Sequence, residues 1–382
     1  MKRLLMLVSL PLLLAAPMRA AFSIYPAMAV QGANVYLFWT ENIVDPPNKN
    51  IQFQRSVDGG NTWKTTLVWT DLTGISESPA ISASGTSVYL TWVNNSPGNN
   101  EIFFQASPDG GINWQPRVRL SNTSGASLHP AIASSGSYVY VAWSDNTTGR
   151  AAIYLRKSAD RGVNWGATQY LSDIYASINW TDAFDPALAA SGANVYAAWY
   201  DSGPPHHDIL FRKSATYGQT WSLAKNLSAN AGDSSEPALA VVNGKIFVVW
   251  QDATSGNYEI FLRRSTDGGA TWKAPQNLSK NAGASQNPKV VSAGAYVYAA
   301  WDDNTYGYTE IHFRRSTDSG LTWKTPLQLT TSLSCIFPAL AVMNSNIYLL
   351  YWTENGPTLW EGFFQKSLDR GVTWAAPKIQ IY

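Results

Sequence analysis

The segment Ser265-Thr266-Asp267-Gly268-Gly269-Ala270-Thr271-Trp272 decides the fold, because variants of it recur along the 382-residue chain. The copies begin at Ser56, Ser107, Ser158, Ser214, Ser265, Ser316 and Ser367. Successive copies start 51 residues apart, except for a spacing of 56 between the third and the fourth. Six units of 51 residues and one of 56 account for the 362 residues that follow the first twenty. A period of this length indicates a repeat architecture built from one supersecondary unit.

Every copy keeps glycine at the fifth position and tryptophan at the eighth. The aspartate can accept hydrogen bonds from the backbone of its own turn, the glycine accepts a positive φ, and the tryptophan can anchor the turn on its blade. Copy four carries Thr216 in place of the aspartate, and copies two and three carry Asn113 and Asn164 in place of the threonine. The motif resembles the Asp-box, or BNR repeat, of the sialidase superfamily.

Each unit contains four segments with the residue pattern of β-strands. A strand of small residues follows a proline, as in 237–240, and an alternating aromatic strand follows it, as in 297–301. The third segment, as in 259–265, leads into the Asp-box, and the fourth follows the motif tryptophan. We therefore predict an all-β, seven-bladed β-propeller with four antiparallel strands and one Asp-box per blade, whose small residues crowd around a central channel.

The predicted organisation is a signal peptide followed by one propeller. Residues 1–20 combine a basic start, an apolar run and a small-residue end, which is the layout of a secretory signal. Residues 21–382 then form a single domain. The predicted blades are 21–73, 74–125, 126–180, 181–231, 232–282, 283–332 and 333–382.

Composition limits the function classes. Without the first twenty residues the chain has 24 basic and 26 acidic residues and no basic block, so we expect no nucleic-acid partner. No apolar stretch is long enough to span a bilayer. The single cysteine, Cys335, excludes an intrachain disulfide. We expect a monomer that is secreted or displayed at the cell surface.

A site is expected on the front face, which carries the hairpins between second and third strands and the crossovers between blades. The Asp-box turns lie on the opposite, back face. One crossover, from Ser172 to Asp185, is five residues longer than its equivalents. We predict a ligand site there, and the candidate residues are His129, Trp180, Asp182, Asp185, His206 and His207, with Trp360 in a more distant front loop. The alternative interpretation is a neutral loop, with solvated histidines and with His129 simply heading its strand, as Asp185, Glu236 and Asn287 head theirs.

Acidic residues recur at both feet of the front hairpins. The pairs are Asp201 and Asp208, Asp252 and Glu259, Asp303 and Glu310, and Glu354 and Glu361. Facing like charges repel, so this pattern suggests a bound cation, with Ca²⁺ as the expected ion and Asp252, Glu259, Asp303 and Glu310 as candidate ligands. In the alternative interpretation these side chains initiate turns and point to water.

The resemblance implies sialidase activity, which requires three arginines on the sugar carboxylate. The first belongs to a Phe/Tyr-Arg-Ile-Pro motif, but this chain reads Ile24-Tyr25-Pro26-Ala27. Of the later arginines only Arg150 falls in a front loop, and those on third strands are expected to be solvated. Sialidases of this type also have six blades. We therefore expect a module that binds a glycan or another extracellular polymer, or a surface interaction module, without sialidase catalysis. The alternative is an exo-sialidase-like glycoside hydrolase or a polysaccharide lyase with its site on the front face.

Overall fold

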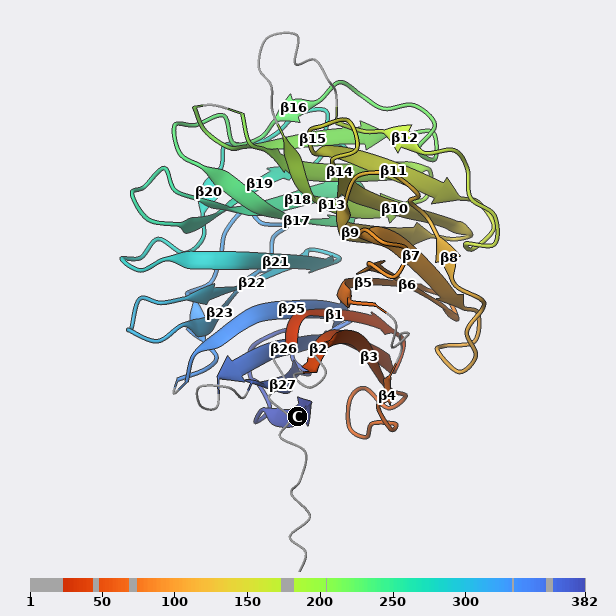
Figure 1. The fold of residues 1–382 in the computed structure, drawn as a ribbon. Helices are drawn as coiled ribbons and strands as arrows, with labels where there is room; N and C mark the ends of the chain where they lie inside the picture. The colour runs from red at the N-terminus through yellow and green to blue at the C-terminus, as the bar shows by residue number, and fades with distance from the viewer. Residues whose placement is uncertain are drawn as a thin grey trace, which may run out of the picture.

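The structure, a computed structural model, describes residues 23–43, 48–68, 74–172, 182–203, 205–331, 333–354 and 360–381. Over these residues the chain forms seven four-stranded antiparallel sheets. The sheets stand side by side around a common axis, from β1 in red to β27 in blue (Figure 1). The predicted all-β, seven-bladed propeller is therefore confirmed. The signal segment and Trp180 lie outside the described residues.

The innermost strand of each blade is the first along the chain, and these strands pack against one another around the axis. They are β1 (Ser23–Gln31), β5 (Ser76–Ser84), β9 (Ser127–Ser135), β13 (Ala183–Ser191), β17 (Ser234–Val242), β21 (Ser285–Ala293) and β25 (Cys335–Met343). All of them except β9 contribute residues to the lining of a channel of about 390 Å³, where alanine and serine lie beside larger aliphatic side chains.

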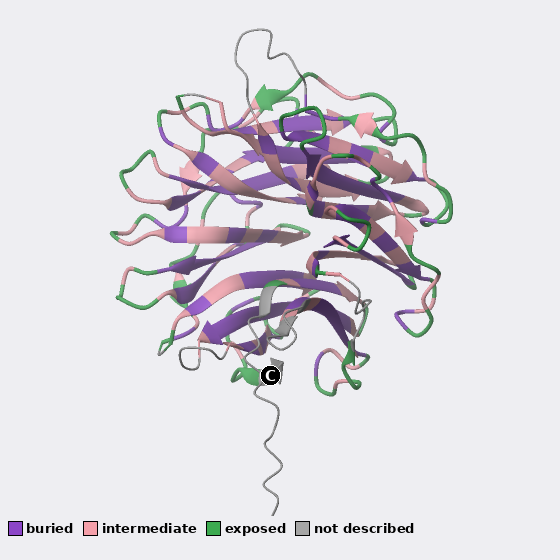
Figure 2. Ribbon diagram, in the orientation of Figure 1, coloured by how far each residue is buried: buried purple, intermediate pink, exposed green. Residues whose placement is uncertain are grey.

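The second strands carry the core. They are β2 (Asn34–Ile43), β6 (Ser87–Asn94), β10 (Tyr138–Asp145), β14 (Asn194–Asp201), β18 (Lys245–Asp252), β22 (Tyr296–Asp303) and β26 (Asn346–Glu354). Their tryptophans, such as Trp250 and Trp301, are fully buried between neighbouring blades. Burial is concentrated in the strands and exposure in the connecting loops (Figure 2).

The third and fourth strands complete each blade. The third strands are β3 (Asn48–Ser56), β7 (Glu101–Ser107), β11 (Ala152–Ser158), β15 (Asp208–Ser214), β19 (Glu259–Ser265), β23 (Glu310–Ser316) and β27 (Trp360–Ser367). The short outer strands are β4 (Leu67–Val68), β8 (Val118–Arg119), β12 (Gln169–Tyr170), β16 (Lys225–Asn226), β20 (Gln276–Asn277), β24 (Leu327–Gln328) and β28 (Lys378–Ile381). Each Asp-box occupies the turn between these two strands.

The Asp-box is held by its own polar atoms. In blade five, Asp267 accepts hydrogen bonds from the Ser265 hydroxyl at 2.7 Å and from the backbone N–H of Thr271 at 2.9 Å. The Ser265 hydroxyl in turn accepts a bond from the backbone N–H of Gly269 at 2.8 Å. In the degenerate fourth copy the hydroxyl of Thr216 replaces the carboxylate and accepts from the backbone N–H of Thr220 at 2.9 Å. The turn therefore keeps its shape without the aspartate.

The Asp-box tryptophan does not anchor its turn on its own blade alone, as the sequence suggested. Trp272 of blade five meets Phe211 of blade four edge to face, with ring centroids 4.9 Å apart. Trp63 of blade one makes the same contact with Phe364 of blade seven, at 5.0 Å. The tryptophan thus joins each blade to the preceding one, and the first and last blades close the ring by the same packing.

The third-strand arginines are half-buried or buried and donate hydrogen bonds to the main chain, which corrects the expectation that they are simply solvated. Arg263 donates from Nη1 to the carbonyl oxygen of Leu227 in the preceding blade at 2.7 Å, and from Nε to that of Lys273 at 2.9 Å. Arg314 repeats both bonds with its own neighbours. These guanidinium groups donate hydrogen bonds to main-chain carbonyl oxygens of the preceding blade, so they hold neighbouring blades together.

Candidate functional site: the front mouth of the central channel

A β-bulge interrupts every innermost strand at the same place. In blade five, Ser235 pairs with Gln251 and Ala238 with Val249, so that two residues, Glu236 and Pro237, oppose the single residue Trp250. The other six blades repeat this count. Proline has no N–H to donate to a ladder, and a bulge is where a strand tolerates this.

The residue before each of these prolines adopts a left-handed conformation, with φ between 47° and 63°. We call this set the mouth ring: Tyr25, Ser78, His129, Asp185, Glu236, Asn287 and Phe337. Each is the third residue of its innermost strand, so the ring lies at the front end of the channel. None of the seven is glycine, although glycine adopts this conformation most easily.

Neighbouring members of the mouth ring touch across blade boundaries. His129 Nδ1 lies 2.8 Å from Asp185 Oδ1, which joins blades three and four. The rings of Tyr25 and Phe337 meet across the closure of the propeller, with centroids 5.6 Å apart and planes tilted by 39°. Tyr25 is 49% exposed, so one face of this aromatic pair is open to solvent.

The charges around the mouth ring act on one another. Burial works to lower the pKa of His129, but the hydrogen bond and charge of Asp185, together with Glu236 and Glu77, outweigh it and raise the pKa. Burial and the negative charge of Asp185 raise the pKa of Glu236, against Lys289 and His129. His129, Asp185 and Glu236 are therefore close enough for their charges to shift the pKa values of His129 and Glu236. Raised pKa values from burial and neighbouring charge are typical of functional clusters.

A second layer of side chains holds the ring backbone in place. In three blades, the backbone N–H of the ring residue donates to a side chain on the second strand of the preceding blade. Ser78 donates to the Thr40 hydroxyl at 3.3 Å, and Asn287 donates to the Gln251 side-chain oxygen at 3.1 Å. Phe337 donates to the Asp302 carboxylate at 3.2 Å. Asp302 also accepts from the Asn287 side-chain amide at 2.9 Å. Burial raises the pKa of Asp302 to about 6 despite these bonds.

Two of the predicted site residues, His129 and Asp185, are thus brought together by the structure. The ring of His207 stacks on that of Tyr200, with centroids 5.7 Å apart. The pKa of Tyr200 is raised, mainly by burial and also by the negative charges of Asp185 and Glu236. This links His207 to the edge of the same site. No described contact ties His206 to the mouth ring, so its predicted role stays a prediction.

The other predicted residues have different surroundings. Asp182 accepts a hydrogen bond from the backbone N–H of Ala151 at 2.7 Å, which fixes the crossover between blades three and four. Trp360 is half-buried and packs against the hydrophobic cluster shared by blades one and seven. Trp180, the aromatic residue of the insertion, lies outside the described residues.

Sequence reasoning did not select Tyr25, Glu236 and Phe337. Their signal was present, because a residue followed by proline recurs in register in all seven units. The sequence does not show that these positions, about 51 residues apart, meet at one point.

The acidic residues at the hairpin feet hold crossovers. Asp252 accepts bonds from the Asn230 side chain at 2.6 Å and the Ser234 hydroxyl at 2.8 Å, on the crossover that enters blade five. Glu259 accepts from the backbone N–H of Asn281 at 3.0 Å, on the crossover that leaves it. The Asn281 side chain continues to Asp303 in blade six.

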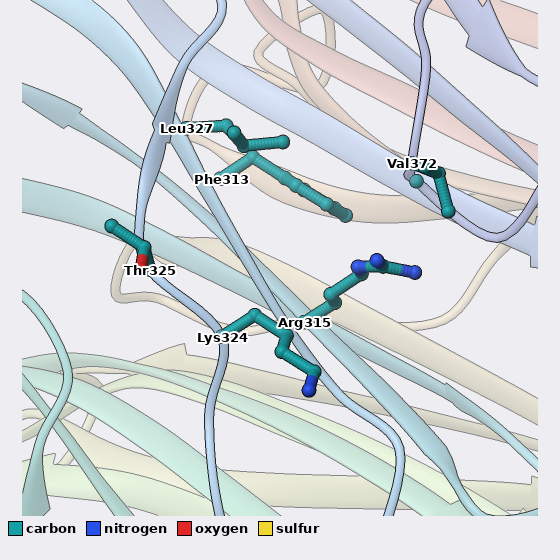
Figure 3. A pocket seen from close by; sticks show the side chains of 7 residues that line it. Phe313, Arg315, Lys324, Thr325, Leu327 and Val372 are labelled. Atoms are coloured by element: carbon teal, nitrogen blue, oxygen red, sulfur yellow. The ribbon is translucent and has the colours of Figure 1, made fainter.

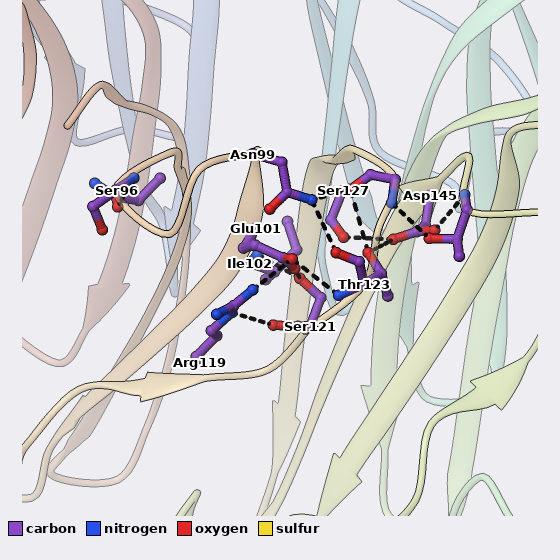
Figure 4. Close-up of polar contacts among 12 residues, drawn as sticks. Ser96, Asn99, Glu101, Ile102, Arg119, Ser121, Thr123, Ser127 and Asp145 are labelled. Carbon is purple, nitrogen blue, oxygen red and sulfur yellow. Dashed lines mark hydrogen bonds and ion pairs between the residues drawn. The ribbon is translucent and has the colours of Figure 1, made fainter.

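Blades two and three repeat this clamp. There Thr123 donates its backbone N–H to Glu101 at 3.0 Å and its hydroxyl to Asp145 at 2.9 Å (Figure 4). These carboxylates are buried and do not point to water. In blade seven the register differs from the predicted pairing, since Glu361 faces Thr353 and Glu354 faces Trp360.

The Ca²⁺ assignment to Asp252, Glu259, Asp303 and Glu310 stays a prediction. Each of these carboxylates accepts a hydrogen bond from a side-chain hydroxyl of its own blade. In the described part of the chain, no three or more His, Cys, Asp or Glu side chains gather as a metal site would require. The hydrogen-bond clamp accounts for the repetition without a cation.

A smaller cavity lies near the back face between blades six and seven. It has a volume of about 240 Å³ and is lined by Phe313, Arg315, Lys324, Leu327 and Val372 among others (Figure 3). Arg315 Nη1 donates to the carbonyl oxygen of Arg370 at 3.3 Å. Lys213 and Lys366 make the equivalent bond at other blade boundaries. The basic lining therefore belongs to the contacts that hold the blades together.

A family model for the BNR repeat-like domain matches residues 50–300. The chain belongs to the BNR repeat-like family. Among curated proteins, none is similar enough in sequence to match. In the described residues no helix is long and apolar enough to cross a membrane.

Solved structures with this fold include sialidases and a polysaccharide lyase. The Hadza microbial sialidase Hz136 is 14% identical with a TM-score of 0.52, over 84% of this chain and 71% of that one. Trypanosoma rangeli sialidase is 14% identical with a TM-score of 0.53, and the match spans 80% of this chain but only 56% of the sialidase. A PL25 ulvan lyase bound to -[GlcA(1-4)Rha3S]- is 10% identical with a TM-score of 0.61, over 88% of this chain and 91% of the lyase. At these identities the likeness concerns the fold.

Proposed function

We propose that this protein is an exported glycan-binding propeller that holds a sugar polymer at the front mouth of its channel without sialidase catalysis. The mouth ring carries this proposal. At seven equivalent backbone positions the chain has seven different side chains, each in a conformation that glycine would adopt with less strain. Strained backbone that is retained with a side chain is a feature of binding and catalytic sites.

The chemistry of the ring suits a sugar. Pyranose rings offer apolar C–H faces and polar hydroxyl edges. Tyr25 and Phe337 provide an aromatic surface, and the polar side chains of His129, Asp185 and Glu236 can exchange hydrogen bonds with hydroxyl groups. An aromatic wall with a few convergent polar groups is the usual composition of a small-ligand site.

The arginines oppose a sialidase mechanism. Holding a sugar carboxylate in two-point fashion requires guanidinium groups, and none of the seven ring positions is arginine. Arg156, Arg212, Arg263 and Arg314 instead donate to main-chain carbonyls at the blade boundaries. Export is supported by residues 1–20, whose composition is that of a secretory signal.

A second candidate function is polysaccharide cleavage, as a lyase or a glycoside hydrolase. The observation that favours it is the convergence of His129, Glu236 and Tyr25, three groups able to transfer protons. The extensive overlap with an ulvan lyase agrees with it at the level of fold.

The test is a glycan-array screen of the full chain, run beside a fluorogenic sialoside assay and an assay for new unsaturated sugar ends. We expect retained binding to at least one glycan class, no sialoside turnover, and loss of binding in Tyr25→Ala. Lys324→Ala, on the back face, should bind like the wild type. Absence of binding to every glycan would overturn the proposal, and turnover would replace it by the second candidate.

A further inference from the structure

We infer that the mouth ring selects sugar units without an anionic group, such as hexoses or N-acetylhexosamines, and rejects units that carry a carboxylate or sulfate. The inference rests on the proposed glycan-binding function and specifies its ligand. It is carried by how the charges at the mouth are paired and by where the aromatic surface lies.

Two basic side chains at the mouth already have carboxylate partners. Lys49 Nζ lies 2.6 Å from Glu77 Oε2, beside the ring residue Ser78. His129 Nδ1 lies 2.8 Å from Asp185 Oδ1. An anionic sugar that approaches either basic group must compete with its partner carboxylate, and displacing that carboxylate would leave it unpaired and partly buried. Leaving a charge without its partner is unfavourable, so an anion has no preferred place here.

A third basic residue, Lys289, follows the ring residue Asn287 by two positions on β21 and pairs with Ala300 of β22, the strand that carries Asp302. Its charge lowers the pKa of both Glu236 and Asp302, against the raising effect of burial, so it lies within the influence of both carboxyl groups. An incoming carboxylate near Lys289 would meet these two groups as well. Among the described residues, this region has the four carboxyl groups of Glu77, Asp185, Glu236 and Asp302 and the three basic side chains of Lys49, His129 and Lys289.

The position of the aromatic pair relative to the acidic residues also favours a neutral sugar. Tyr25 and Phe337 belong to blades one and seven, whereas His129, Asp185 and Glu236 belong to blades three to five. A sugar at the mouth can therefore stack one face on the aromatic pair while its hydroxyl groups reach the carboxylates. A carboxylate accepts hydrogen bonds only, which suits hydroxyl and amide N–H donors and does not suit anionic oxygens.

This arrangement is more than a group of acidic residues. Seven strands supply it, its backbone is held by Thr40, Gln251 and Asp302 from the second strands, and aromatic and acidic side chains occupy separate arcs. Such second-layer support keeps the ligand-facing groups in position.

The experiment compares matched glycan pairs on an array and in solution. Each pair consists of a neutral oligosaccharide and its derivative with a terminal sialic acid, uronic acid or sulfate. For the full chain we expect the neutral member to bind about tenfold or more tightly, which is the effect of one unfavourable charge contact near the surface. Asp185→Asn and Glu236→Gln should reduce this ratio, because each removes a repelling charge.

The matched control is Asp160→Asn, which makes the same chemical change on the back face of the adjacent blade. It should leave the ratio unchanged. Binding of neither member of any pair would overturn the proposed function. Preferential binding of the anionic members, or a ratio that Asp185→Asn and Glu236→Gln do not change, would overturn this inference and leave the proposed function standing.

Discussion

The Asp-box turns and the mouth ring are both sevenfold repeats, and they differ in what is repeated. The Asp-boxes keep both backbone and side chains: a positive φ falls on glycine, as at Gly269, and serine and tryptophan recur in every copy. The mouth ring keeps the backbone alone, and its side chains range from serine to phenylalanine. The uniform side chains of the Asp-box stabilise every blade, and the divergent side chains of the mouth ring are the ones that we propose contact a ligand.

The backbones also show where strain is accepted. A left-handed conformation is readily available to glycine and unfavourable by about 1–2 kcal/mol for most other residues. The Asp-boxes place glycine at the left-handed fifth position, but four of them hold a non-glycine residue in this conformation at the fourth position, namely Arg161, Tyr217, Ser319 and Arg370. The mouth ring holds a non-glycine residue in it in all seven blades, where the bulge opposite the buried second-strand aromatic residue imposes the conformation.

The largest expected effect is loss of an Asp-box tryptophan. Trp272→Ala removes the edge-to-face contact with Phe211 between blades four and five. We expect a loss of about 3 kcal/mol in the free energy of unfolding, the lower end for buried aromatic residues, since Trp272 is half-buried. Urea denaturation followed by circular dichroism measures it. Sugar binding should persist below the transition; a stability like that of the wild type would contradict the role we give this tryptophan.

A smaller effect is expected at His312, on the third strand of blade six. It is buried between Trp301 and Tyr306, and its Nε2 has no hydrogen-bond partner among the described residues. The third strands of blades five and seven carry Phe261 and Phe363 at this position. Replacing a buried polar group without a partner by a matching apolar one should stabilise the protein by about 1 kcal/mol in His312→Phe.

This stabilisation should grow as the pH falls. Burial lowers the pKa of His312 below its ordinary value of 6.5, against the opposing charge of Asp303. The unfolded chain therefore takes up the proton first, and the native state of the wild type loses stability as the pH drops below 6.5. Chemical denaturation at pH 7.5 and pH 5.5 tests the prediction. An equal difference between wild type and variant at both values would contradict it.

A still smaller effect is expected from repairing the degenerate Asp-box. In blade three, the backbone N–H of Asn164, followed by the Ser158 hydroxyl, lowers the pKa of Asp160 to about 2. A carboxylate introduced by Thr216→Asp should gain the same bonds and raise the melting temperature by about 1 °C at pH 7.

The sign of the pH dependence follows from the lowered pKa. The added stability should be present above an ordinary aspartate pKa near 3.8 and be lost as the pH falls toward 2. Thermal melts at pH 7 and pH 2.5 compare the two proteins. A benefit as large at pH 2.5 as at pH 7 would show that ionisation of the new carboxylate is not its source.

A substitution in the mouth ring should change the free energy of unfolding least and glycan binding most. Glu236→Gly removes a side chain at φ 53° and places there the residue that tolerates this conformation best. We expect a free energy of unfolding within about 0.5 kcal/mol of the wild type, because relief of strain offsets the greater flexibility of the unfolded chain. Glycan binding should fall at the same time. A variant that loses stability as Trp272→Ala does would erase the distinction between the two regions.

Much of the fold could be predicted because its determinants are local. The spacing of the Asp-boxes defines the units, and the alternation of apolar residues in segments such as 297–301 defines the strands. Glycine and tryptophan at fixed positions define the turn. These signals act within about ten residues, and ring closure follows once seven similar units must bury their faces against one another.

The site could be predicted only in part. The five-residue insertion drew attention to the crossover before Asp185, and the histidine count drew attention to His129; the structure brings these two together. Glu236 and Tyr25 belong to units that look regular in sequence, so no irregularity marked them. The repeated hairpin acids suggested a cation because sequence shows their spacing and not their partners, which are hydroxyls, amides and backbone groups of the crossovers.

The sequence by itself determined the repeat, the strand order, the Asp-box turns and the absence of the Phe/Tyr-Arg-Ile-Pro arginine at 24–27. Only the tertiary structure decided which residues meet. Closure of the ring brings seven pre-proline positions to one channel mouth, turns each Asp-box tryptophan onto the preceding blade, and aims third-strand arginines at carbonyls of a neighbouring blade. The physical reason is distance along the chain: local patterns fix turns and strands, whereas contacts between blades join residues about 50 positions apart that acquire a common environment only when the propeller closes.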